Sequence, residues 1–166
     1  MRPPRDRRLG GRRVPTRRQG VRRVARAGAL SEQPPRLAGV YETVLYATDV
    51  APTARFYAET LGLRAVEEPS ELSAAFRLPD GGVLLIFDPA RSSVPDRPVP
   101  THGTLGAGHI AFAVKKGELD AFGERLRRSG AEIERETTWD EGGRSLYVRD
   151  PAGNSVELIE GEAWKV

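Results

Sequence analysis

From Val40 onward, the hydrophobic and polar positions follow a fixed succession: an alternating strand, a short amphipathic helix and three further strands. The segment VYETVLYATDV predicts the first strand, and APTARFYAETLGL predicts a helix that ends at Gly62. Strands are predicted near LRAVEE, SAAFRLP and VLLIFD, the last two joined by a turn at Asp80-Gly81-Gly82. The first half of the chain is therefore predicted to form a βαβββ unit.

The same succession recurs in the second half, after a linker rich in proline and glycine. It consists of the strand HIAFAVK, the helix GELDAFGERLRRSG and the strands AEIERET, RSLYVRD and SVELIEG, with a DPAGN segment that we interpret as turn chemistry only. Module one spans residues 38–89, the linker 90–105 and module two 106–162. Because one helix covers one face of each sheet, we predict an α+β fold in which two tandem βαβββ modules form a curled mixed sheet around a central cavity, with the helices on the outer face.

The composition supports one domain. The 166 residues, 39% of them hydrophobic, suffice for a single core, which we place at residues 38–166. The absence of cysteine excludes disulfides and thiolate ligands or nucleophiles. No apolar run is long enough to cross a bilayer, so we expect a cytoplasmic protein with no membrane partner.

The charge is divided unevenly along the chain. Residues 1–36 carry 12 arginines against Asp6 and Glu32, whereas residues 37–166 carry 14 basic and 21 acidic side chains. We expect the Arg-rich tail, residues 1–37, to be disordered. It could be a nucleic-acid-binding arm, an organelle transit peptide, a twin-arginine export signal, a solvated appendage, or upstream sequence included by a start codon assigned too early.

Two features narrow these interpretations of the tail. No apolar stretch follows the arginine pairs, which argues against export. No aromatic residues are interleaved with the arginines to stack on bases, which argues against nucleic-acid binding. The early start codon or a solvated appendage is therefore favoured.

Polar residues occupy equivalent positions in the two modules. Alternate residues of each opening strand face opposite sides of the sheet, and the side away from the helix carries Glu42 in module one and His109 in module two. Superposing GGVLLIFD on GNSVELIE by their glycine turns places Leu85 in the position of Glu157. These four positions converge on the cavity, and three of them can bind a metal ion.

Each of the three has an ordinary structural alternative. His109 could be a core histidine with one hydrogen bond, Glu42 a solvated carboxylate, and Glu157 an ion-pair partner of Arg149. Their common placement favours a metal, because an unpaired carboxylate facing an apolar cavity costs on the order of several kcal/mol. Two carboxylates and one imidazole favour Fe(II) or Mn(II), also admit Zn(II), Ni(II) or Co(II), and leave coordination positions open for a substrate.

The expected cavity lining indicates a small-molecule substrate with an aromatic or otherwise apolar body. We assign to this lining Val44, Tyr46, Leu85, Phe87, Ala111, Arg144 and Tyr147. Arg144 lies in a glycine-containing hairpin and could hold an anionic group of the substrate. His102, in the linker, is either a proton-transferring group or an exposed loop histidine.

The segments ETVLYATDVAPTARFYAETLGL, GHIAFAV and RDPAGNSVELIE resemble the vicinal oxygen chelate superfamily over residues 38–162. This superfamily includes glyoxalase I, extradiol dioxygenases, fosfomycin-resistance thiol transferases, methylmalonyl-CoA epimerase and bleomycin-resistance proteins. The resemblance implies metal ligands in the first and last strand of each module, here Glu42, Leu85, His109 and Glu157. Leucine cannot coordinate, which leaves the three positions that the extradiol and fosfomycin enzymes use, normally with histidine in place of Glu42.

Three functions follow as hypotheses. The first is a divalent-metal-dependent enzyme that acts on a small organic substrate chelated through vicinal oxygens, by ring-cleaving dioxygenation or by glyoxalase-like lyase or isomerase chemistry. The alternative is a metal-free small-molecule-binding protein of the bleomycin-resistance type, which Leu85 and Glu42 favour. A nucleic-acid-associated protein would act through the Arg-rich tail alone. The modules either close a cavity within one chain or pair with those of a second chain, so the sequence admits a homodimer.

Overall fold

The computed structural model describes residues 34–165. The chain divides into two units, Met1–Leu37 and Ala38–Val166, and the helices and strands below belong to the second. The expectations for the Arg-rich tail fall mainly on residues 1–33, which lie outside the described residues. Between residues 34 and 165, no helix has the length and apolar character needed to cross a membrane.

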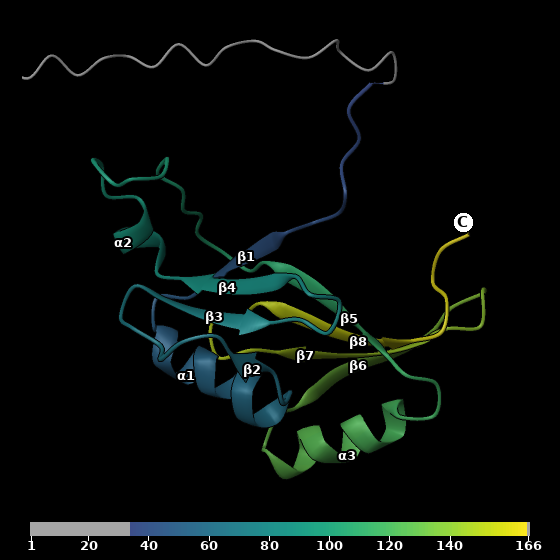
Figure 1. Cartoon of the computed structure of the whole chain (residues 1–166). Coiled ribbons are helices and arrows are strands. Elements are labelled where there is room, and N and C mark those ends of the chain that lie inside the picture. The colour runs from purple at the N-terminus through teal and green to yellow at the C-terminus, as the bar shows by residue number, and fades with distance from the viewer. Residues whose placement is uncertain (1–33, 166) are drawn as a thin grey trace, which may run out of the picture. The chain divides into compact units, whose positions relative to one another are not determined.

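Module one forms its own mixed sheet. Its elements are β1 (Glu42–Tyr46), α1 (Val50–Arg55), the π-helical turn η1 (Phe56–Thr60), β2 (Arg64–Ala65), β3 (Ser73–Arg77) and β4 (Val83–Phe87). The strand order is β1-β4-β3-β2, with β1 parallel to β4 and the other pairs antiparallel. The helix α1 runs directly into η1, and α1 packs on β3 and β4 (Figure 1). The helical segment ends at Gly62, whose φ of 77° favours glycine.

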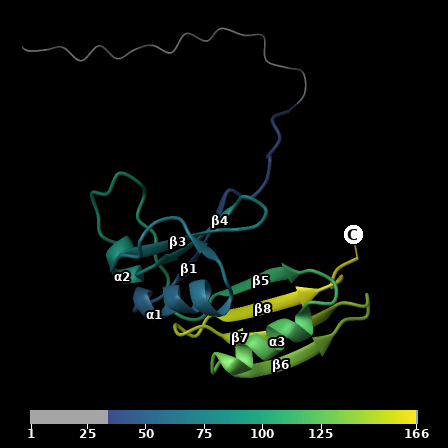
Figure 2. The same ribbon diagram turned by 60° about the horizontal axis from the view of Figure 1, so that its bottom comes forward.

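Module two repeats this topology. After the short linker helix α2 (Pro89–Ser92), its elements are β5 (His109–Val114), α3 (Leu119–Arg128), β6 (Ile133–Thr138), β7 (Arg144–Arg149) and β8 (Ser155–Glu160). The strand order is β5-β8-β7-β6, again with one parallel pair, β5 with β8. The helix α3 packs against β6, β7 and β8 (Figure 2). The α+β class and the two βαβββ modules of the prediction are confirmed.

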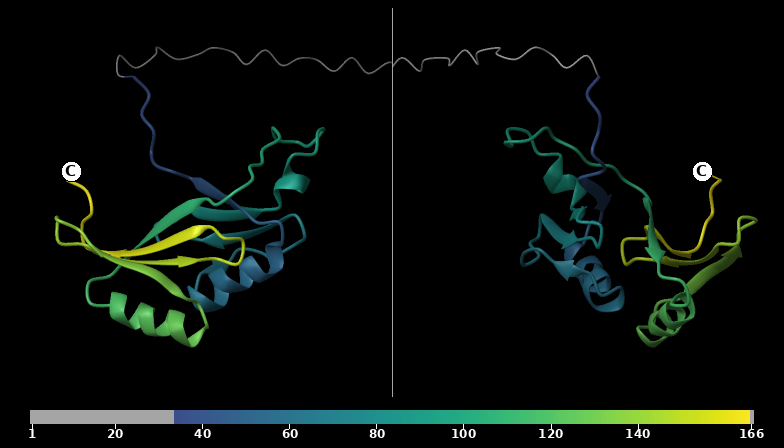
Figure 3. Two further views of the ribbon diagram at one scale, coloured as in Figure 1. Left: turned by 180° about the vertical axis from the view of Figure 1, so that it is seen from behind. Right: turned by 45° about the vertical axis from the view of Figure 1, so that its right-hand side comes forward.

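The two sheets differ from the prediction in remaining separate. Within residues 34–165, β1 and β5 lie at the edges of their sheets and pair only with strands of their own module, so the sheets do not close into a barrel (Figure 3). The linker also holds α2, a helix that was not among the predicted elements. The Asp88 carboxylate caps this helix by accepting hydrogen bonds from the Ala90 and Arg91 amides at 2.7 and 3.3 Å.

The alternation of apolar residues in the strands has the predicted consequence for burial. One face of each sheet packs on its helix and forms the core, which includes Leu45, Leu84, Ile86, Val156 and Leu158. The opposite face is less buried, and it carries the polar positions that the sequence analysis selected, with Glu157 the buried exception. The side chains away from the helices are therefore those available for chemistry.

A buried hydrogen-bond network joins the two modules. The Tyr57 hydroxyl of η1 donates to Asp150 Oδ2 at 3.0 Å, and Asn154 Nδ2 donates to the same oxygen at 2.9 Å. Asn154 Nδ2 also donates to the Tyr46 carbonyl oxygen at 3.1 Å. Burial, reinforced by the Asp150 carboxylate, raises the pKa of Tyr57 far above its ordinary value.

The same network fixes the start of β5. Asn154 Oδ1 accepts a hydrogen bond at 2.7 Å from the Gly108 amide, immediately before His109. A side chain at position 108 would force its neighbours to shift, because a Cβ there would lie 2.7 Å from a methyl carbon of Leu45. The DPAGN segment therefore does more than form the predicted turn: it also joins the modules and positions the strand that carries His109.

Candidate functional site

Strand pairing shows that the four candidate ligand positions occur at equivalent places in the two modules. Glu42 and His109 are the first residues of β1 and β5. Val44 of β1 lies opposite Leu85 of β4, and Ala111 of β5 lies opposite Glu157 of β8. Leu85 and Glu157 are therefore equivalent members of the repeat.

His109 and Glu157 lie together. The His109 Nε2 atom is 3.4 Å from Glu157 Oε2, with about half of the His109 side chain exposed and the Glu157 carboxylate buried. Two ligand atoms at about 2.1 Å from one metal ion and at a right angle are about 3 Å apart, so the pair fits two ligands of a single ion. The same contact becomes an ion pair when the imidazole is protonated, so proton and metal would compete for this nitrogen.

Glu157 is held by residues of the neighbouring strand and hairpin. The buried Ser145 hydroxyl donates to Glu157 Oε1 at 2.5 Å, and Trp139 Nε1 donates to Ser145 Oγ at 2.8 Å. Tyr147 lies opposite Glu157 in the β7–β8 register, and its ring stacks on that of His109 with centroids 6.5 Å apart. Burial and the Glu157 carboxylate raise the pKa of Tyr147. One carboxylate oxygen is therefore fixed while the other points toward His109.

Ser145 was not among the predicted site residues. The sequence does contain a hint of its role. Ser145 is a small polar residue two positions before Tyr147 in RSLYVR, so both side chains lie on the same face of β7, the face that carries Glu157 on the neighbouring strand β8. Such a residue, buried beside a carboxylate, is a recognisable orienting group for a metal ligand.

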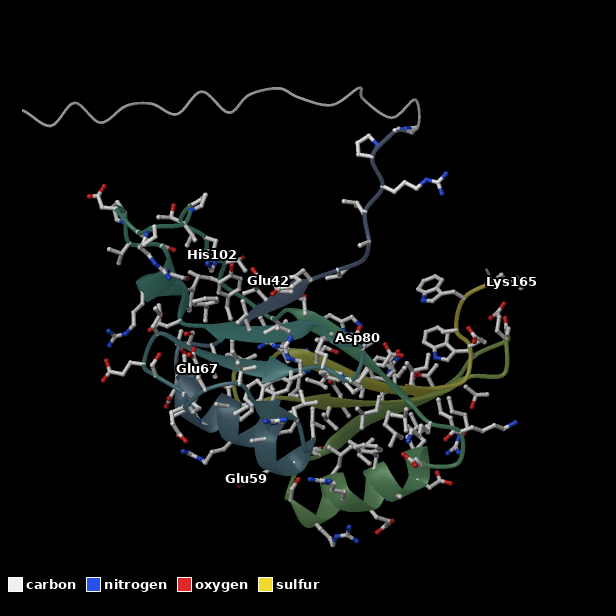
Figure 4. All side chains as sticks on the ribbon, viewed as in Figure 1. Glu42, Glu59, Glu67, Asp80, His102 and Lys165 are labelled. Carbon is white, nitrogen blue, oxygen red and sulfur yellow. The ribbon has the colours of Figure 1, made fainter. Side chains whose placement is uncertain are left out.

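Glu42 does not join this pair within one chain. It is exposed at the start of β1, on the side of the sheet away from α1 (Figure 4). Across residues 34–165, no three His, Asp or Glu side chains come together as a set that could hold a metal ion. One chain thus supplies two adjacent donors and a third donor elsewhere.

The predicted pocket residues fall into two groups. Val44, Tyr46, Leu85 and Phe87 are half-buried on paired positions of β1 and β4, and together they form a continuous apolar surface on module one. On module two, Ala111 is exposed beside Glu157, and Tyr147 is half-buried.

Arg144 lies apart from this surface. Its guanidinium donates to Asp120 of α3 at 3.0 Å, and this contact raises its pKa. Alternate residues of a strand face the same side of the sheet, so Arg144 lies on the same side as the buried Leu146 and Val148. This is the side that packs on the helix, opposite to the side that carries Glu157. The structure therefore corrects its assignment to the pocket lining.

His102 is not a freely exposed loop residue. Its Nδ1 atom lies 2.9 Å from the Tyr46 hydroxyl, and its ring packs edge-on against Phe87 with centroids 4.8 Å apart. Figure 4 shows His102 and Glu42 on the same side of module one, away from α1. The linker thus brings His102 onto the surface of the predicted pocket residues Tyr46 and Phe87.

A hollow of about 540 Å³ lies between the modules, on a different part of the surface. Most of its lining comes from apolar side chains, including Leu61, Leu78, Ile110 and Phe112. Of the predicted pocket residues, Ala111 alone lines this hollow. The central cavity expected around Glu42, His109 and Glu157 is thus not the hollow that the modules enclose here.

Comparisons with known proteins agree with this architecture. The model of the Glyoxalase/Bleomycin resistance protein/Dioxygenase superfamily matches residues 39–158. MhqE of Bacillus subtilis (strain 168), a candidate ring-cleaving dioxygenase, is 32% identical over 116 residues, which are 63% of this chain and 36% of that protein. The metallothiol transferase FosB of Shouchella clausii (strain KSM-K16) is 42% identical over 55 residues, 32% of this chain and 38% of that protein. The matched part of this chain spans little more than a third of the length of these curated relatives.

A solved structure matches over its whole length. The crystal structure of lactoylglutathione lyase from Agrobacterium tumefaciens superimposes with a TM-score of 0.73 and 37% sequence identity, covering 81% of this chain and 100% of that chain. The family match runs from just before β1 into β8, and so includes both modules and all four candidate ligand positions. The chain belongs to the glyoxalase/bleomycin resistance protein/dioxygenase superfamily.

Proposed function

We propose that this protein is a divalent-metal-dependent enzyme that acts on a small organic molecule bound through two neighbouring oxygen atoms, with His109, Glu157 and Glu42 as the protein ligands. The observation that carries the proposal is the approach of His109 Nε2 to Glu157 Oε2 at 3.4 Å, at strand positions equivalent to Glu42 and Leu85. When bound, the metal would supply Lewis-acid stabilisation of an oxyanion on the substrate. Two carboxylates and one imidazole favour Fe(II) or Mn(II).

The third ligand comes from a second copy of the chain in this proposal. Glu42 and His109 start strands at the open edges of their sheets, and both side chains are exposed. Large apolar residues are exposed beside both edges: Val40 and Tyr41 precede β1, and Leu105 precedes β5. A symmetric dimer would cover these residues and bring the partner's Glu42 to His109 and Glu157.

The protein side chains would have three tasks at such a site. Ser145 holds Glu157 Oε1 and leaves Oε2 for coordination. The apolar surface of Val44, Leu85 and Phe87 suits the hydrocarbon or aromatic body of a substrate and excludes water from it. The hydrogen-bonded pair of Tyr46 and His102 can hold or transfer a proton at the edge of this surface.

The reaction is proposed to be ring-cleaving dioxygenation or glyoxalase-like lyase or isomerase chemistry. Ring cleavage is supported by the similarity to MhqE, and lyase chemistry by the similarity to the Agrobacterium lactoylglutathione lyase. Oxygen uptake with catechols, and loss of hemithioacetals formed from methylglyoxal and a thiol, should separate the two when measured with protein reconstituted with Fe(II) or Mn(II). Glu157→Gln should abolish the activity, whereas Glu132→Gln, at an exposed position in the loop before β6, should retain it.

A second candidate function is a metal-free small-molecule-binding protein. It is favoured by Leu85, which cannot coordinate a metal, and by the separation of Glu42 from the other two donors within one chain. In that case neither substrate class would be consumed. An apolar ligand would then bind equally to the wild type and to the His109→Ala and Glu157→Gln variants.

A further inference from the structure

The hollow between the modules exposes apolar side chains whose equivalents in module one are part of the core. Ile110, Phe112 and Val114 of β5 line this hollow, and all three are only half-buried. The equivalents of Phe112 and Val114 in module one are Leu45 and Ala47, which are 4% and 2% exposed. The helix α3 packs mainly on β6, β7 and β8, so the helix side of β5 faces the hollow instead.

Module one supplies the opposite wall of the hollow. This wall includes Leu61 and Leu63, at the end of the helical segment, and Leu78, just after β3. The volume of about 540 Å³ lies within the range of small-molecule pockets, roughly 300–1,000 Å³. Exposed apolar surface gathered in a concavity is typical of ligand-binding sites. The hollow therefore has the size and the lining of a site for a small apolar body.

The lining also carries a single charge. Asp80, in the turn between β3 and β4, is the only charged residue that lines the hollow within residues 34–165. Its Oδ1 atom accepts a hydrogen bond from the Gly82 amide at 2.9 Å. No basic side chain in the described part of the chain forms an ion pair with Asp80. Arg77, on the same hairpin, donates instead to the Gly81 carbonyl oxygen at 2.9 Å, so Asp80 is available to a cation from outside the chain.

We infer that the hollow between the modules binds a small molecule with an apolar body and a protonated amine, the apolar walls covering the body and Asp80 pairing with the ammonium group. The carboxylate attracts a cationic ligand and repels an anionic one, whereas a neutral ligand gains from the apolar walls alone. The hollow contains none of the proposed metal ligands, so the inference stands or fails independently of metal binding.

The test is calorimetric titration of the chelator-treated full-length protein with phenethylamine, phenethyl alcohol and hydrocinnamate. The three compounds share one apolar body, and at about pH 7 they carry a positive charge, no charge and a negative charge. Phenethylamine should bind saturably. The alcohol should bind roughly two- to fivefold more weakly, as expected for the loss of an exposed ion pair, and hydrocinnamate more weakly still.

Variants of the lining show whether the amine binds in this hollow. Asp80→Asn should reduce the affinity for phenethylamine to that for the alcohol, because asparagine keeps the hydrogen-bond acceptor but loses the charge. Asp140→Asn, at an exposed position in the hairpin between β6 and β7, removes the same charge and should leave the affinity unchanged. Val114→Phe should reduce the affinity at least roughly fivefold by filling the hollow, whereas Val99→Phe, at an exposed position in the linker, should not.

Each result bears on the inference directly. If Val114→Phe fails to fold, as its melting curve would show, Asp80→Asn carries the comparison. The inference would be overturned by the absence of saturable phenethylamine binding to the wild type, or by either analogue binding as tightly as the amine. Equal affinity in the wild type and in a folded Asp80→Asn or Val114→Phe variant would overturn it as well.

Discussion

The Ser145 hydroxyl donates to one oxygen of Glu157 at 2.5 Å, while the other oxygen of the same carboxylate lies 3.4 Å from His109 Nε2. A buried carboxylate with one oxygen fixed and the other directed at an imidazole is suited to act as a monodentate ligand. The orientation of this proposed ligand would thus depend on a serine that is not itself a proposed ligand.

Replacing Ser145 with alanine should therefore weaken metal binding without removing a ligand. We expect the metal dissociation constant to rise roughly 10- to 100-fold and the free energy of unfolding to fall by about 1–3 kcal/mol, because Glu157 loses a buried partner. Metal titration and thermal melting would measure the two effects. Thr138→Ala, on exposed β6, is the control and should change neither. Unchanged metal affinity in Ser145→Ala would show that the serine has no orienting role.

The proposed sharing of ligands between two copies can be tested by mixing variants. Glu42→Ala and His109→Ala should each lose the metal as homodimers, because every site in them lacks one ligand. After the two variants are unfolded and refolded together, about half of the dimers contain one copy of each variant. If the ligands of a site come from different copies, one of the two sites in each mixed dimer is intact. About a quarter of the wild-type metal should therefore return. Elemental analysis of the refolded mixture gives the answer. No recovery would mean that each site is built within one chain.

The buried Tyr57 predicts a specific alkaline sensitivity. Its pKa is raised in the folded chain, chiefly by burial and then by Asp150, so the folded state keeps the proton at a pH where the unfolded chain loses it. The stability from this group is fully present below the unfolded pKa of about 10 and is lost at higher pH, at about 1.4 kcal/mol per pH unit.

Tyr57→Phe removes this titration. The wild type should be more stable than the variant by a constant amount below about pH 10, and the difference should shrink above it. Urea unfolding of both proteins from about pH 8 to about pH 11 measures the difference, with other titrating groups common to the two. A difference that stays constant over the whole range would contradict this account of Tyr57.

Asn154 should matter to the placement of His109 as well as to stability. Its amide bonds Asp150, the Tyr46 carbonyl oxygen and the Gly108 amide, so Asn154→Ala leaves several buried polar groups unpaired. We expect a loss of about 3 kcal/mol in unfolding free energy. We also expect the His109 imidazole resonances to shift in the NMR spectrum. Ser155→Ala, at the next residue, forms the control and should cost less than about 1 kcal/mol.

The sequence predicted those features that follow from local periodicity. Alternation in VLLIFD and SVELIE placed Leu84, Ile86 and Val156 in the core, and the repeat made Leu85 equivalent to Glu157. The same rule applied to RSLYVR would have placed Arg144 with Leu146 on the helix side, where its partner Asp120 lies.

The remaining features depend on contacts that have no local signal. The separation of Glu42 from His109 is set by how two modules meet, and alternation within a strand carries no information about that. The linker has no periodicity, so nothing in PDRPVPTHG indicated that Arg97 and His102 would both reach Phe87. Long-range docking, rather than secondary structure, limited the prediction of the site.

The proposed function requires that His109, Glu157 and Glu42 bind one divalent metal. Its most direct test is elemental analysis of the protein purified anaerobically without chelator, beside Glu42→Ala, His109→Ala, Glu157→Ala and the control Glu132→Ala. We expect about one equivalent of iron, manganese or another divalent metal per chain in the wild type and the control, and loss of the metal in the three ligand variants. A wild type without metal even after reconstitution, or metal retained in all three variants, would contradict it.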